Sequence, residues 1–134
     1  MPQVTQNYFR AAAIFLLAGI AIGLQMSISG NHNVTGAHAH VSLLGWVSCA
    51  IFGVYFALCR EKAASFWAAL QFWIIVVSCA VMSAGLYLLL LGYTAMAPVV
   101  AAGSIVYFVG AALFVWIVFL PLTNASTSHK RVPG

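Results

Sequence analysis

Four long apolar runs dominate this chain and leave few folds open to it. They cover about residues 8–29, 38–59, 66–91 and 95–122. A bilayer's hydrocarbon core of about 30 Å requires about 20 apolar residues in a helix, and each run meets that length. The sequence therefore predicts an all-α membrane protein of four transmembrane helices, with a single domain over residues 1–134 and a polar tail over 123–134.

Composition excludes several classes of function. Hydrophobic residues make up 64% of the chain and charged residues only 4%, against about 25% in a typical soluble domain. The basic residues form no continuous patch, so nucleic-acid binding is not expected. The only acid, Glu61, lies between two runs. A transporter or an acid–base enzyme would need a carboxylate within the membrane, and neither is supported.

The short connections predict both topology and orientation. Loops of this length make successive helices antiparallel neighbours in a bundle. Lysine and arginine concentrate in cytoplasmic loops of membrane proteins. Arg10, Arg60, Lys62, Lys130 and Arg131 all fall on one predicted side. We therefore expect both termini to be cytoplasmic, in a bacterial inner membrane, with the first and third connections on the outer face.

Most other polar or small residues within the runs are expected to serve helix packing. Small residues let helices approach closely in lipid, and candidates here are Gly19, Gly23, Ser78, Gly85, Gly103 and Gly110. The amides of Gln25 and Gln71 are expected to be buried and to bond across helices. The three cysteines lack the spacing of a metal or haem-attachment motif and are interpreted as packing residues.

The histidine pair at the start of the second run is the main candidate for chemistry. Neutral histidine is the commonest metal ligand, and ionisable residues in a membrane mark functional sites. Residues two apart on a helix project about 200° from each other, so His38 and His40 are suited to two different centres. A stripe of small residues continues from His38 and leaves room for a flat ligand or a close helix: Ser42, Gly45, Cys49 and Gly53.

The segment His38-Ala-His40-Val-Ser-Leu-Leu-Gly45-Trp46, followed by Ile51-Phe52-Gly53-Val54-Tyr55, resembles small four-helix proteins related to haem-copper oxidase subunit I. It is similar, more loosely, to the nitric oxide reductase branch of that superfamily. The resemblance implies a fold equal to one third of the twelve-helix catalytic subunit. It also implies that three copies form a homotrimer.

The same resemblance implies a b-type haem held between subunits by His38 and His40, beside Ser42 and Gly45. Iron with two axial histidines suits electron transfer, with a quinone or a respiratory membrane protein as partner. The chain departs from the large subunits because it has no further histidine helices. Ser42 also stands where asparagine is expected in the small relatives. Oxygen or nitric oxide reduction is therefore not expected.

Two alternatives stay open at the level of the sequence. In the first, His32, His38 and His40 cluster at the outer face and bind copper or zinc. In the second, the chain is a structural or assembly subunit of a respiratory complex and carries no cofactor. An optical spectrum distinguishes haem from both alternatives, and metal analysis distinguishes the two from each other.

Overall fold

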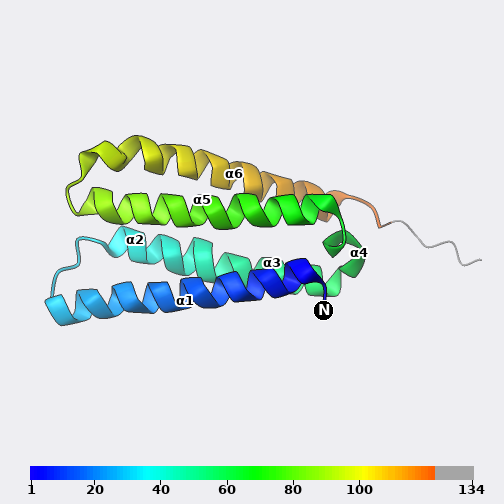
Figure 1. Ribbon diagram of the computed structural model, residues 1–134, viewed down its shortest axis with the longest axis horizontal. Coiled ribbons are helices and arrows are strands. Elements are labelled where there is room, and N and C mark those ends of the chain that lie inside the picture. The colour runs from blue at the N-terminus through cyan, green and yellow to red at the C-terminus, as the bar shows by residue number, and fades with distance from the viewer. Residues whose placement is uncertain (123–134) are drawn as a thin grey trace, which may run out of the picture.

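The computed structural model describes residues 1–122, and the predicted polar tail at 123–134 lies outside this part. The described residues form an all-α bundle with four helical spans that are long and apolar enough to cross a membrane. In chain order the elements are α1 (Gln3–Ser29), α2 (Thr35–His40), the π-helical η1 (Val41–Val47), α3 (Ser48–Leu58), α4 (Arg60–Ala63), α5 (Phe66–Leu90), the short 3-10 helix η2 (Thr94–Met96) and α6 (Ala97–Phe119). The second span joins α2, η1 and α3 into one rod (Figure 1).

Helix ends differ from the predicted boundaries for local reasons. α1 begins at Gln3 instead of near residue 8, because polar side chains continue the helix: Gln3 Nε2 donates to Asn7 Oδ1 at 2.9 Å. The second span begins at Thr35, so His38 lies one turn inside it. α6 ends at Phe119, before the predicted residue 122, because Leu120 precedes a proline and adopts an extended backbone.

Two helical hairpins pack side by side to form the bundle. α1 pairs with the rod of α2, η1 and α3, and α5 pairs with α6 (Figure 1). α5 also contacts the rod and thereby joins the hairpins, whereas α1 and α6 share no substantial contact within residues 1–122.

Close helix contacts are confirmed at the predicted glycines. A Cβ added to Gly19 would lie 2.8 Å from Ser42 Oγ of η1, and one added to Gly103 would lie 2.9 Å from Met82 Cβ of α5. On α5 itself, a Cβ at Gly85 would lie 3.2 Å from Val100 of α6. Glycine therefore sets the close approach of the helices in both hairpins.

The side chains of Tyr8 and Gln71 link α1, α5 and α6 within the core. Both side chains are 0% exposed, and the Tyr8 hydroxyl donates to Gln71 Oε1. Gln71 Nε2 in turn donates to the carbonyl of Gly110 on α6 at 3.5 Å. The prediction that Gln71 bonds across helices is confirmed. Gln25 also bonds across helices, accepting from the Tyr87 hydroxyl at 2.8 Å, but its side chain is exposed, so the prediction of its burial is wrong.

Removing the hydroxyl of Tyr8 is expected to destabilise the bundle modestly. Tyr8→Phe leaves Gln71 Oε1 without its partner, and polar contacts between membrane helices average about 0.6 kcal/mol, with about 1.7 as the upper end. We expect a loss near 1 kcal/mol, measured by reversible unfolding in mixed micelles. Combining Tyr8→Phe with Gln71→Leu should cost less than the sum of the single changes. Additive losses would show that the two groups do not interact.

The N-terminus and α4 lie at the same end of the bundle (Figure 1), and α4 carries Arg60 and Lys62. Lys62 of α4 donates to the Tyr55 hydroxyl at 3.1 Å and to the carbonyl of Val118 at 2.9 Å. Val118 lies in the last turn of α6, where carbonyls lack helical partners and the helix dipole favours a cation. Lys62 therefore fastens the end of α6 to the connection between the hairpins.

Candidate cofactor site at the histidine pair

The loop before the histidine pair is built from short polar contacts. Gly30 ends α1 in the left-handed conformation, with φ of 69°. Asn33 N donates to Asn31 Oδ1 at 2.9 Å, and the Thr35 hydroxyl donates to the carbonyl of His32 at 2.6 Å. These contacts close the loop and start α2 at Thr35. The second span therefore enters the bundle with His38 and His40 on its first two turns.

His38 points toward α1. Its Nδ1 lies 2.9 Å from the carbonyl oxygen of Gly19, and a Cβ on Gly23 would lie 3.0 Å from His38 Cε1. The imidazole ring thus rests on the glycine face of α1. Because a carbonyl oxygen only accepts, Nδ1 must carry the hydrogen of this bond. In the neutral ring the lone pair is then on Nε2.

The Nδ1 atom of His40 is also bonded to a glycine carbonyl, on a different flank of the span. Its Nδ1 lies 2.8 Å from the carbonyl oxygen of Gly36, one turn earlier in α2. Gly36 itself lies against α5, because a Cβ added to Gly36 would lie 3.4 Å from Leu90 Cδ1. His38 therefore packs against α1, whereas the hydrogen bond of His40 stays within α2. This separation agrees with the divergence that the spacing of two residues predicts.

Both rings are only partly buried, and each offers Nε2 as a ligand atom. Within residues 1–122, neither His38 nor His40 has a hydrogen bond to Nε2, and neither Nε2 is among the fully buried polar atoms without a partner. Histidines that bind metals commonly donate their other ring N–H to a carbonyl, which fixes the ring and its tautomer. The pair therefore has two ring nitrogens without hydrogen bonds in the described part of the chain, one on each histidine.

Ser42 and Gly45 lie beside α1, so the space next to them is filled by a helix in this structure. Ser42 Oγ faces Gly19, and a Cβ on Gly45 would lie 2.6 Å from Phe15 Cγ. Farther along the stripe, Cys49 is fully buried and Gly53 packs against Tyr8 and Phe9. Of the two uses predicted for the small-residue stripe, the close approach of a helix is the one observed. Ser42 and Gly45 therefore position the histidine helix.

The span changes from α to π geometry directly after His40, although its hydrophobic pattern predicts a continuous α-helix. The segment Val41–Val47 is π-helical, and the Ser48 hydroxyl donates to the carbonyl of Leu43, five residues earlier, at 2.9 Å. Phe15 presses on the backbone at Gly45 in the middle of this segment. Single π turns within helices are frequent at functional sites. In the sequence, only the glycine at position 45 indicates that another side chain packs closely on this segment.

His32 does not join the pair. It lies in the exposed loop, with Nδ1 3.2 Å from the carbonyl of Gly30. Residues 1–122 contain no group of three or more histidine, cysteine, aspartate or glutamate side chains placed to hold a metal ion. The three-histidine cluster is therefore not assembled within the described part of one chain.

Comparison of the chain with protein-family models, with curated proteins and with solved structures finds no match.

Proposed function

We propose that this protein is a membrane-embedded b-type haem protein, in which His38 of one subunit and His40 of the next hold each haem in a homo-oligomer, with a homotrimer favoured by the resemblance to one third of a twelve-helix subunit. The observation that carries the proposal is the pair of bonds from Nδ1 to the carbonyls of Gly19 and Gly36. They orient both rings and leave both Nε2 atoms for iron. The divergence of the rings supports ligation by two subunits instead of one.

The bound haem would supply one-electron oxidation and reduction at its iron. The role of this chain is to hold the two imidazoles in place and to supply apolar surroundings for the site between subunits. Two histidine ligands leave no axial position for a substrate, so we infer electron transfer without turnover of oxygen or nitric oxide. The loops are short, which favours a quinone or another membrane protein as the redox partner. In this proposal the end with Arg10, Arg60 and Lys62 is cytoplasmic.

Alanine substitutions test the ligands directly. Wild type expressed with excess haem is expected to show the sharp reduced bands of six-coordinate haem, and His38→Ala or His40→Ala to lose or convert them. His32→Ala is the matched control, because this histidine lies in the exposed loop. Haem per chain and the reduced-minus-oxidised spectrum provide the measurement. Wild type without haem would refute the proposal.

A complementation experiment tests the sharing of haem between subunits. Chains with His38→Ala retain His40, and chains with His40→Ala retain His38. Co-expression should therefore rebuild an intact pair of ligands wherever the two kinds of chain meet in the required order. Partial recovery of the six-coordinate spectrum in mixed oligomers is the expected result. If both variants bind no haem separately and none together, the ligands do not come from neighbouring subunits.

A further inference from the structure

A long apolar groove runs between α1 and α5 on the outside of the bundle. It consists of two hollows of about 600 and 490 Å³, which share Ile14, Phe15 and Ala80 and so adjoin each other. One end of the groove is lined by Asn7 and Arg10. The other end is lined by Gln25 and Tyr87, whose side chains are bonded to each other. The groove is thus apolar along its length and polar at both ends.

The position of Arg10 corresponds to the head-group level of a bilayer. The part of α1 from Ala11 to Ser29 rises about 28 Å, which is close to the thickness of the hydrocarbon core. Arg10 therefore lies at the boundary of that core. From Arg10 to Gln25 the groove extends about 22 Å, and one leaflet of the core is only about 15 Å deep. A lipid chain beginning at Arg10 has room to lie in the groove across a whole leaflet.

Arg10 has the chemistry to hold a phosphate at this level. Its side chain is exposed, and Nη1 donates to Asn7 Oδ1 at the long distance of 3.5 Å. A guanidinium has five N–H donors, and arginine binds phosphate through two parallel bonds. Trp73 lines the same end of the groove and is 60% exposed. Tryptophan at the head-group level presents an apolar ring and one N–H donor.

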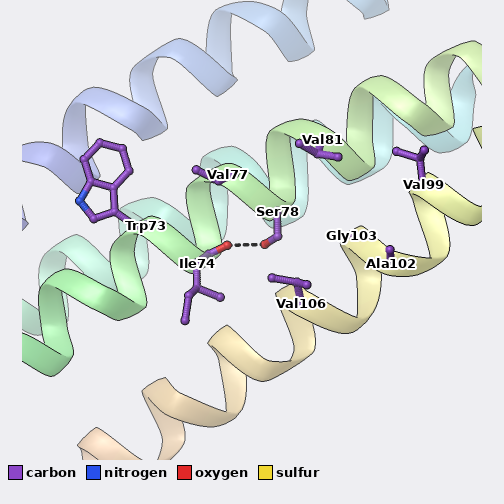
Figure 2. A pocket seen from close by; sticks show the side chains of 9 residues that line it. All are labelled: Trp73, Ile74, Val77, Ser78, Val81, Val99, Ala102, Gly103 and Val106. Carbon is purple, nitrogen blue, oxygen red and sulfur yellow. Dashed lines mark hydrogen bonds between the residues drawn. The ribbon is translucent and has the colours of Figure 1, made fainter.

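The groove between α5 and α6 provides an internal comparison. It has a similar volume of about 560 Å³ and shares Trp73 with the first groove (Figure 2). Its lining residues include no charged side chain. The only lining hydroxyl, that of Ser78, donates to the carbonyl of Ile74 at 2.5 Å, as Figure 2 shows. Apolar shape is common to both grooves, whereas a cation at the membrane boundary belongs to the α1–α5 groove.

From this difference we infer that the α1–α5 groove is a binding site for an anionic glycerophospholipid. The phosphate is held by Arg10, and one acyl chain lies between α1 and α5 past Ile14 and Ala80. The charge of the guanidinium, the level of Arg10 and the length of the groove all specify this occupant. The inference does not depend on haem.

Native mass spectrometry of the delipidated protein in mild detergent tests the site with phosphatidylglycerol and phosphatidylcholine. Wild type should retain phosphatidylglycerol in preference to phosphatidylcholine. Arg10→Gln should lower that preference about fivefold, the effect of one basic residue near an anionic lipid. Arg60→Gln is the matched control, because it removes the same charge at the same end, from α4, and Arg60 does not line the groove.

A second variant tests the acyl-chain position. Ala80 is exposed and lines both hollows, so Ala80→Phe fills the groove without entering the core. This variant should lose retention of phosphatidylglycerol while remaining a monodisperse helical protein. Equal losses from Arg10→Gln and Arg60→Gln, or full retention by Ala80→Phe, would overturn the inference. If Ala80→Phe instead dissociates an oligomer, the groove binds a second copy of the chain and the lipid site is refuted.

Discussion

If the protein binds haem as proposed, Gly23→Val is expected to lower its haem content although both histidines remain in the chain. A Cβ at this position would already lie 3.0 Å from His38 Cε1, and the two methyl groups of valine extend farther toward the ring. The imidazole must then move and give up its bond to the carbonyl of Gly19. Losing a partner that orients a metal ligand typically lowers metal affinity about 10- to 100-fold. We expect a loss of haem affinity in that range.

Ala13→Val is the matched control for this prediction. Ala13 lies on the same helix, its side chain is exposed, and the added methyl groups point away from the core. Haem per chain and the reduced spectrum should remain at wild-type values in this variant. A Gly23→Val protein that is folded, has the normal oligomer mass and keeps an unchanged haem spectrum would show that His38 is not an axial ligand.

The sequence predicts the helices and their close contacts, but it does not predict which carbonyl groups bond to the histidines. Four apolar runs with three short connections determine four antiparallel helices, because each backbone polar group in lipid must be satisfied within a helix. The small-residue positions Gly19 and Gly103 could be identified as close contacts for the same reason. That His38 bonds to Gly19 depends on the relative height of two helices, which no local pattern specifies.

The π-helical segment and the helix ends were missed for related reasons. The segment Val41–Val47 is apolar and would form an α-helix by its hydrophobic pattern alone. Its π geometry accompanies the packing of Phe15 on Gly45, a contact between residues that are far apart in the chain. The start of α1 was missed because Gln3 and Asn7 are polar, although the bond between their side chains supports a helix. Hydropathy indicates where a helix meets lipid and does not indicate where its hydrogen bonding begins.

Gly103→Val is expected to cause the largest loss of stability in the bundle. A Cβ at Gly103 would lie 2.9 Å from Met82 Cβ and 3.2 Å from Met82 N and Cα. The last two are backbone atoms, so a change of rotamer cannot relieve the clash, and α5 and α6 must separate. Overpacking of this kind typically costs 1 to 3 kcal/mol. We expect about 3 kcal/mol, measured as the free energy of unfolding in mixed micelles.

The size of this effect follows from how α6 is held. Within residues 1–122, α6 packs mainly against α5, so the affected contact is its principal attachment. Helices in lipid gain no hydrophobic free energy from association, and close packing supplies the attraction that a water-soluble core would receive from apolar burial. Ala102→Val is the control, because it adds two methyl groups at the neighbouring exposed position, which lines the groove of Figure 2. This substitution should change the free energy of unfolding by less than about 0.5 kcal/mol. Equal effects of the two substitutions would mean that the close approach at Gly103 does not hold α6 in place.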